Sequence, residues 1–270
     1  MASNIVFAGS IPYNYETYLG PIFFEPYAVD LVERIRENND ESILELACGT
    51  GRVTKHLIKL LLAHGTLTAT DLNDGMLQIA KQSISDSRIQ WLVADAHTLP
   101  FADLQFDLVV CQFGVMFFGD KPKAFSEVLR VLKPNGQFVF NTWHDVPHNA
   151  LANLTEKALQ EIFPRDAPSF FMQGPHSFYD TDVIKQLLAD AGFVQIKIEK
   201  VKKTSVASTH ENAVEGILHG TPLNNYLKER SEEDKEVQQR LRKLLVEQFG
   251  EKNLELPMEA FICEATKPAQ

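Results

Sequence analysis

The chain has 270 residues, of which 44% are apolar and 23% charged, and its 26 basic and 36 acidic residues give a formal net charge of −10. This length accommodates one large domain with an elaborated cap, or two small domains. The acidic balance argues against a nucleic-acid partner, whose binding depends on Lys and Arg. No run approaches the roughly eighteen apolar residues of a membrane span, and the first seven residues lack the pattern of a secretory signal. We therefore expect a cytoplasmic protein with no membrane span.

The N-terminal segment, residues 1–39, combines an aromatic cluster with one helix. The helix is predicted over Glu25–Arg36, because its apolar residues recur on one face and would pack on a sheet. Some of the aromatic side chains ahead of it belong to the core, and the rest form an apolar flap. The aromatic residues of the segment are Tyr13, Tyr15, Tyr18, Phe23 and Phe24 ahead of the helix and Tyr27 within it.

The first strand and the loop after it are the most informative part of the chain. The stretch Ser42–Gly51 begins with a short apolar run, which reads as a buried parallel strand with Glu45 at its end, and finishes in a small-residue turn that contains Gly49 and Gly51. Glycine permits backbone conformations and a close ligand approach that a side chain blocks. A helix is predicted next, over Val53–Ala63. This order of elements predicts a nucleotide site.

A carboxylate follows the glycine loop at an informative distance. If the helix returns over the sheet, Thr66–Leu72 becomes the next parallel strand, and Asp71 reaches its carboxyl end beside the loop. A carboxylate there can accept hydrogen bonds from both hydroxyls of a ribose. Nicotinamide dinucleotides and S-adenosylmethionine both satisfy this geometry.

Three features favour S-adenosylmethionine. Thr54 replaces the third glycine of the dinucleotide fingerprint G-x-G-x-x-G. Glu45 at the end of the first strand would repel a pyrophosphate and favour the ammonium of a methionine moiety. A third predicted strand, Ile89–Ala96, contains Asp95 near its end, so one edge of the sheet is acidic. Asp95 taken alone is also a good turn cap.

The later elements continue an alternation of strand and helix. Strands four and five come first, and two insertions, a sixth strand and the last strand follow them. The predicted ranges are a fourth strand within Phe106–Phe113 that ends before Gln112, helix and turn Ala124–Gly136, strand Gln137–Trp143, a helical insertion over Pro147–Pro175, helix Asp180–Ala191, strand Val194–Val201, helix Glu232–Phe249 and strand Ala260–Lys267. This alternation predicts an α/β fold with a doubly wound sheet.

Five ordered blocks of this sequence resemble the class I S-adenosylmethionine-dependent methyltransferases, particularly the small-molecule branch with the ubiquinone and menaquinone biosynthesis enzymes. The blocks are Ile43–Gly51, Ala69–Met76, Ala94–Phe101, Phe106–Phe113 and Ala124–Gly136. The resemblance implies a Rossmann-like, seven-stranded, mostly parallel sheet whose antiparallel last strand inserts between strands five and six. It implies one domain, 1–270, with an N-terminal lid (1–39), a cofactor-binding core (40–145) and cap insertions (146–176 and 202–257).

The resemblance also assigns cofactor contacts residue by residue. Glu45 and the backbone from Ala47 through Gly49 to Gly51 would hold the methionine part, and Asp71 the ribose hydroxyls. The adenine would meet Leu72, Met76, Asp95 and the backbone of Ala96, and Gln112 would lie beside the transferring methyl group. Ala47 stands where the family has its first loop glycine, a mild change provided that the position needs no positive φ angle.

Substrate contacts are predicted from aromatic residues near these strand ends. Tyr18 belongs to the flap that resembles the family's lid, whereas Phe113, Phe117 and Trp143 either wall an aromatic or lipid-like substrate or serve as ordinary packing. His144, directly after strand five, is the candidate general base for an acceptor that must lose a proton. The alternative for His144 is a loop histidine without a catalytic role.

These observations predict methyl transfer from S-adenosylmethionine to a small organic acceptor by in-line displacement, with S-adenosylhomocysteine as the product. The alternative is a non-catalytic S-adenosylmethionine-binding protein with a regulatory or interaction role. A short-chain dehydrogenase is disfavoured because no tyrosine is followed by a lysine four positions on. The three cysteines and eight histidines show no metal-ligand spacing, so we expect no metal. The chain is expected to be a monomer or homodimer, and the acceptor is not predicted.

Overall fold

The computed structural model describes residues 9–35 and 42–269. The first eight residues of the predicted lid and its last four, 36–39, lie outside the described residues, as does the final residue of the predicted helix Glu25–Arg36. The chain divides into two compact units. The sheet unit comprises Ala28–Trp143, Phe178–Val201 and Ala260–Gln270, and the helical unit comprises Met1–Tyr27, His144–Ser177 and Lys202–Glu259.

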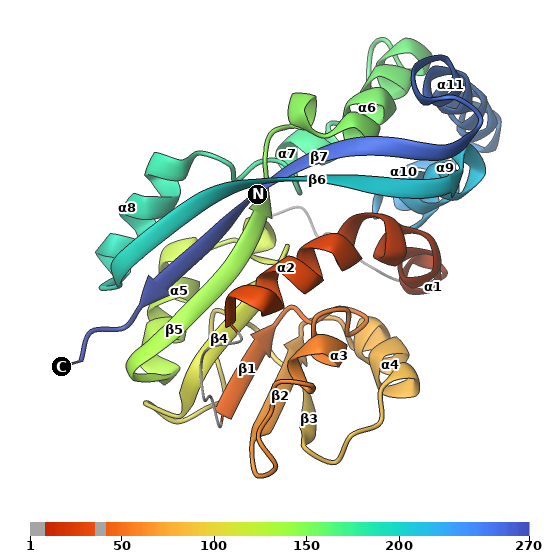
Figure 1. Ribbon diagram of the computed structural model, residues 1–270. Coiled ribbons are helices and arrows are strands. Elements are labelled where there is room, and N and C mark those ends of the chain that lie inside the picture. The colour runs from red at the N-terminus through yellow and green to blue at the C-terminus, as the bar shows by residue number, and fades with distance from the viewer. Residues whose placement is uncertain (1–8, 36–41, 270) are drawn as a thin grey trace. The chain divides into compact units, whose positions relative to one another are not determined.

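A seven-stranded sheet with the order β3-β2-β1-β4-β5-β7-β6 organises the fold (Figure 1). Strands β1 to β5 pair in parallel, and β7 pairs antiparallel with β5. The predicted insertion of the last strand between strands five and six is therefore confirmed. The strands are β1 (Ser42–Leu46), β2 (Thr66–Asp71), β3 (Ile89–Val93), β4 (Phe106–Gln112), β5 (Leu132–Trp143), β6 (Val194–Thr209) and β7 (Lys252–Thr266).

The strand order reverses between β1 and β4. The chain runs outward in one direction through β1, β2 and β3, then returns to the other side of β1 and runs through β4 and β5. Because such crossovers are right-handed, helices that follow the two series lie on opposite faces of the sheet. Ligands of open α/β sheets bind outside the carboxyl ends of the strands where the order reverses, so the loops after β1 and β4 are the expected site.

The helices of the sheet unit begin and end where their sequences provide caps. Asn73 accepts the N–H of Met76 at the start of α4, and Asp180 accepts the N–H groups of Asp182 and Val183 at the start of α8. Gly192 ends α8 with a φ of 103°, directly after Ala191, where the helix was predicted to end. These helices are α2 (Glu25–Ile35, in this unit from Ala28 on), α3 (Thr54–Leu57), α4 (Asp74–Ser83), the 3₁₀-helix η2 (Val115–Phe117), α5 (Lys121–Val131) and α8 (Thr181–Ala191).

Helix α3 is much shorter than the predicted helix Val53–Ala63. After Leu57 the backbone tightens into i→i+3 hydrogen bonds, such as Lys59 N–H to His56 and Leu60 N–H to Leu57. The guanidinium of Arg88, just before β3, donates to the carbonyls of Ile58 and Leu61. A side chain from another part of the sheet unit therefore satisfies the carbonyls that a longer helix would have used.

Several strand boundaries also differ from prediction. Strand β3 ends at Val93, so Asp95 lies in the turn beyond it and not in the strand. Strand β5 begins five residues before the predicted Gln137. Strands β6 and β7 are each eight residues longer than predicted on the side of the second insertion, so only the middle of residues 202–257 is helical. Pairing between β6 and β7 extends these segments, and in the added part of β7 the buried Leu254, Leu256 and Met258 alternate with exposed residues.

The helical unit contains the remaining helices, and α11 packs against α6 and α9. Within the N-terminal segment, α1 leads into a π-helix that contains Pro21. Proline has no N–H group to donate, and wider i→i+5 bonding tolerates the ring. Gly216 of α9 faces Tyr18 and Leu19, leaving room for this close approach. The elements are α1 (Ile11–Asn14), π-helix η1 (Tyr15–Phe24), 3₁₀-helix η3 (Val146–His148), α6 (Ala150–Ile162), α7 (Phe170–Gln173), α9 (His210–His219), α10 (Leu223–Leu227) and α11 (Ser231–Phe249).

Among residues 9–35 and 42–269, no helix combines the length and the apolar character that crossing a membrane requires.

Candidate cofactor site

The loop after β1 turns through three residues with left-handed backbone. The φ angles are 51° at Ala47, 57° at Gly49 and 85° at Gly51. Gly51 also packs tightly, because a Cβ atom there would lie 2.6 Å from Ile84 Cδ1 and 3.3 Å from Ala80 Cβ of α4. Glycine is thus required at position 51 for its conformation and for its small size. The loop holds its backbone close to the carboxyl end of β1.

Alanine at position 47 was expected to be a mild change only if the position needs no positive φ angle, and the φ angle of Ala47 is positive. The left-handed region costs a residue with a Cβ about 1–2 kcal/mol. Its methyl group is accommodated by Gly114, after β4, where an added Cβ would lie 2.5 Å from Ala47 Cβ and 2.7 Å from Cys111 Sγ. The loop after β1 therefore packs against the loop after β4 because the methyl group of Ala47 faces Gly114, which has no side chain.

We expect Gly114→Ala to destabilise the protein by about 1–3 kcal/mol, the usual cost of overpacking. The φ angle of Gly114 is −106°, which alanine adopts, so the cost comes from the collision and not from the backbone. Urea unfolding of Gly114→Ala, Ala47→Gly and the double variant measures the coupling. In the Ala47→Gly background, Gly114→Ala should lower the free energy of unfolding by at least about 0.5 kcal/mol less than in the wild type, because residues in contact couple by that amount or more. Additive effects would contradict this packing.

Asp71, the last residue of β2, is fixed by two backbone amides. Its Oδ2 accepts the N–H of Gly49 at 2.8 Å, and its Oδ1 accepts the N–H of Asn73 at 2.8 Å. Burial raises the pKa of Asp71, although the amides of Asn73 and Gly49 favour its charged form. A carboxylate has about four acceptor positions, so two remain for ligand hydroxyl groups.

Glu45 in β1 is a fully buried carboxyl group. Its Oε2 accepts the hydroxyl of Thr54 at 2.6 Å. Burial raises the pKa of Glu45 to about 8, and the nearby charge of Asp71 contributes to this rise, while the Thr54 hydroxyl opposes it. A buried carboxyl group with a raised pKa gains most from a positively charged partner. The site at the end of β1 therefore favours a cationic ligand.

Asp95 lies in a turn that His97 organises. Its Oδ1 accepts the backbone N–H of His97 at 2.9 Å and contacts Nδ1 of the same residue at 2.6 Å. The Nε2 of His97 accepts the N–H of Asp120 at 3.1 Å, so the proton of a neutral His97 ring is on Nδ1 and is donated to Asp95. Burial alone raises the pKa of Asp95, but the hydrogen bonds from His97 hold it below its usual value.

The turn cap considered for Asp95 is thus present, and His97 joins it to the start of α5. Further along the same connection, Glu127 of α5 accepts the N–H of Leu99, and Arg130 donates to the carbonyls of Leu99 and Phe101. The connection between β3 and β4 is therefore attached to α5 at several points. Sequence reasoning missed His97, whose only local signal was its position two residues after a capping Asp.

The end of β4 carries a second strained residue. Phe113 has a φ of 49°, and its N–H donates to Oδ1 of the buried Asn141 in β5 at 2.8 Å. Its ring stacks on Trp143 with 3.8 Å between ring centroids and 5° between planes. Gln112 pairs with Asn141 in the sheet register. Strained backbone therefore follows both strands where the sheet order reverses, a location where strain often accompanies function.

The other predicted cofactor residues belong to the same unit but differ in exposure. Met76 of α4 is buried, and its Cε is 3.6 Å from the position of a Cβ on Gly49. Leu72 is 70% exposed directly after β2 and remains a predicted adenine contact. Ala96 is half-buried. Phe117 of η2 is 36% exposed and remains a predicted substrate contact.

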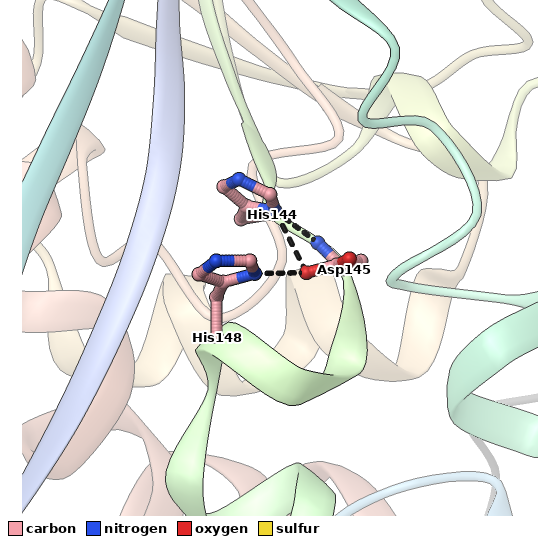
Figure 2. A group of neighbouring side chains, drawn as sticks. All are labelled: His144, Asp145 and His148. Carbon is pink, nitrogen blue, oxygen red and sulfur yellow. Dashed lines mark hydrogen bonds and ion pairs between the residues drawn. The ribbon is translucent and has the colours of Figure 1, made fainter.

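Two predicted site residues, Tyr18 and His144, belong to the helical unit. Figure 2 shows His144 grouped with Asp145 and His148. Burial and the neighbouring His148 lower the pKa of His144. Its Nδ1 lies 2.7 Å from the backbone N of Asp145, whose N–H it can accept, and 2.8 Å from Oδ1 of the same residue. The catalytic role of His144 and the substrate role of Tyr18 remain predictions.

The fold and these side chains define a class of protein: an open, doubly wound α/β protein with a glycine loop and two carboxylates at the carboxyl ends of β1 and β2. Proteins of this class bind nucleotides or adenosyl groups at such loops.

Comparison with known proteins identifies the class more closely. Residues 44–140 match the family model of a methyltransferase domain. The ubiquinone/menaquinone biosynthesis C-methyltransferase UbiE of Shewanella halifaxensis is 28% identical over 178 residues, which cover 61% of this chain and 71% of that protein. The fold is similar to that of phosphoethanolamine N-methyltransferase 2 from Haemonchus contortus, with a TM-score of 0.60, 19% identity and coverage of 95% of this chain and 56% of that one.

The [4+2]-cyclase SpnF also shares the fold, with a TM-score of 0.57, 16% identity and coverage of 91% of this chain and 82% of that one. The match of residues 44–140 and the curated relatives support a class I S-adenosylmethionine-dependent methyltransferase similar to UbiE. The predicted fold, enzyme class and cofactor are confirmed.

Proposed function

We propose that the sheet unit holds S-adenosylmethionine at the ends of β1, β2 and β4 and that the protein methylates a small organic acceptor. The observation that carries this proposal is the joint arrangement of Glu45, the glycine loop and Asp71, in which a loop amide donates to the ribose-binding carboxylate. The non-catalytic alternative has no observation in its favour.

The residues present fit the cofactor in three respects. The left-handed backbone at Gly49 and Gly51 forms a loop without side chains, which a ligand can approach closely. Asp71 keeps acceptor positions for two ribose hydroxyls, and its orientation is already fixed by Gly49 and Asn73. Glu45 is a buried carboxyl group that a cation would stabilise in its charged form.

The mechanism needs positioning more than a reactive side chain. The bound cofactor would supply a methyl group on a positively charged sulfur, and this sulfur would leave as a neutral thioether when a nucleophile attacks the methyl carbon in line. Asp71 and the loop would fix the adenosyl end, and the stacked Phe113 and Trp143 would supply an apolar surface that excludes water. Holding two reactants in register contributes about 7–11 kcal/mol to lowering a barrier. No general base is assigned, since only some acceptors need one.

Turnover assays test this proposal. The purified chain is incubated with S-adenosylmethionine and, separately, with quinols, phenols, amines and carboxylates, and S-adenosylhomocysteine is quantified by mass spectrometry. Quinols come first, because the related UbiE proteins are named for quinone biosynthesis. We expect one class of acceptor to raise product formation at least tenfold above the acceptor-free reaction. The site of methylation then follows from the product's fragmentation spectrum.

The outcome that would overturn the proposal is cofactor binding without product from any small-molecule class. Asp71→Asn should abolish the stimulated turnover. Asp74→Asn is the matched control, because it removes the same charge three residues away, where the carboxylate contacts only the exposed Gln78. Equal losses in both variants would remove Asp71 from the proposed site.

A further inference from the structure

A second group of chemically capable side chains lies in the helical unit, outside the cofactor site. His144, Asp145 and His148 each offer one ligand atom, and these atoms lie within 4.8 Å of one another (Figure 2). The Oδ1 of Asp145 is 2.8 Å from Nδ1 of His144 and also contacts Nδ1 of His148. One carboxylate oxygen therefore touches both imidazole rings.

Local backbone structure brings the three residues together. Pro147 occupies the first turn of the 3₁₀-helix η3, and the N–H of His148 donates to the carbonyl of Asp145 at 3.2 Å. This tight turn returns His148 over Asp145. The rings of His144 and His148 then stack with 3.9 Å between centroids. The sequence signal is His-Asp-x-x-His, which lacks the regular spacing of common metal motifs and was missed for that reason.

Hydrogen bonds from buried polar side chains to the backbone of His144 and Asp145 fix this turn. Asn149 donates to the carbonyls of His144 and Asp145, at 3.2 and 3.1 Å, and accepts the N–H of Glu259. The Nδ1 of His176 contacts the carbonyl of His144 at 2.6 Å. Asn149 and His176 are only 3% and 6% exposed. The donor atoms are thus attached to a fixed backbone, as preorganised ligand sets are.

The contacts around Asp145 contain a conflict that no single proton resolves. The Nδ1 of His144 faces the backbone N–H of Asp145 at 2.7 Å and the carboxylate of the same residue at 2.8 Å. If Nδ1 carries a lone pair, it accepts the amide N–H but repels the carboxylate. If Nδ1 carries a proton, it donates to the carboxylate but cannot accept the amide N–H. A metal ion bound by the carboxylate oxygen and the two ring nitrogens removes this conflict. Only the hydrogen bond from the Asp145 amide to His144 is then lost.

The donor set selects the kind of ion. Two imidazole nitrogens and one carboxylate oxygen suit Zn²⁺ and similar first-row divalent ions, whereas Mg²⁺ and Ca²⁺ prefer oxygen ligands. The side chain of His148 is 44% exposed and that of Asp145 is 29% exposed, so an ion can enter from solvent. Three protein ligands leave a coordination position for water or for an oxygen atom of a small molecule.

We propose that His144, Asp145 and His148 form a Zn²⁺-type metal site in the helical unit. This inference is independent of the proposed acceptor, and its test reads metal binding and not turnover. Its failure would leave the cofactor site and the methyl transfer untouched.

The experiment is equilibrium dialysis of the full chain against buffered Zn²⁺, followed by metal analysis. The wild type should bind one Zn²⁺ per chain. The variants His148→Ala and Asp145→Asn should bind at least about 100-fold more weakly, because changing a residue behind a metal ligand already costs about 10–100-fold. With Co²⁺ in place of Zn²⁺, the wild type should show visible absorption bands that His148→Ala lacks.

His219→Gln is the matched control. His219 also contacts two carboxylates in the helical unit, but Glu215 meets its Nδ1 and Asp234 meets its Nε2, on different sides of the ring. This variant should bind Zn²⁺ like the wild type. Circular dichroism and S-adenosylmethionine binding should be unchanged in His148→Ala, which excludes unfolding as the cause of its loss. Equal Zn²⁺ affinity of the wild type and His148→Ala, or no binding by the wild type at 100-fold molar excess over protein, would overturn the site.

Discussion

Asp71→Asn is expected to raise the dissociation constant of S-adenosylmethionine at least about 100-fold, because two hydrogen bonds to a charged acceptor together contribute about 3–6 kcal/mol. The variant keeps the shape of the side chain but has a single acceptor oxygen. It can no longer accept the N–H groups of both Gly49 and Asn73 and still face a ribose. Isothermal titration calorimetry measures this change directly.

The comparison with Asp74→Asn separates a local effect from a general effect of charge. Asp74 lies in the first turn of α4, where its negative charge favours the helix. Its loss should lower the stability of α4 slightly and leave the cofactor affinity within about twofold. Unchanged affinity in Asp71→Asn would mean that the ribose is bound elsewhere, and the proposed arrangement of the cofactor would then be wrong.

Glu45→Gln is expected to remove a pH dependence of folding stability. The pKa of Glu45 is about 8 in the folded protein and near its usual value in the unfolded chain, so the folded state binds this proton more tightly. The wild type therefore loses stability as the pH rises through the window between these two values, with a slope of up to about 1.4 kcal/mol per pH unit. Below the window both states are protonated, and above it both are ionised.

Urea unfolding at several pH values from 4 to 9 tests this expectation. The free energy of unfolding of Glu45→Gln, relative to the wild type, should increase with pH up to about 8 and then stay constant. Glutamine is the suitable replacement because its amide keeps the size of the side chain and an oxygen for the Thr54 hydroxyl. Parallel pH profiles of the two proteins would show that the pKa of Glu45 is the same in the folded and unfolded states, which would contradict this expectation.

The same carboxyl group links cofactor binding to proton release. If the bound cation holds Glu45 in its charged form, binding near pH 6.5 expels the proton that the free protein carries there. Titrations in two buffers with different ionisation enthalpies should then give different apparent binding enthalpies for the wild type. They should give equal enthalpies for Glu45→Gln.

Local patterns in the sequence were sufficient for the parallel core. The order of strand-like runs, a glycine turn and acids predicted β1, β2 and β4 within a residue or two, because strands buried on both faces are rich in apolar and β-branched residues. Chain order then put Glu45 and Asp71 at neighbouring strand ends. Strand β3 was less accurate, since capping by Asp95 ends it early.

Contacts between distant parts of the chain decided what the sequence left open. The left-handed Ala47 is compatible with its neighbours because Gly114 leaves space for the methyl group. Similarly, His97 owes its tautomer to the amide of Asp120, and Arg88 satisfies the carbonyls of Ile58 and Leu61 beyond the end of α3. No local pattern contains these partners.

The sequence by itself thus determined the class of fold, the cofactor and the order of the chemical groups along one edge of the sheet, because hydrophobic periodicity and turn chemistry act over a few residues. Only the tertiary structure decided which backbone positions are strained, how long β6 and β7 extend, and that His144, Asp145 and His148 share one oxygen atom. These features depend on packing and hydrogen bonds whose partners become neighbours after folding.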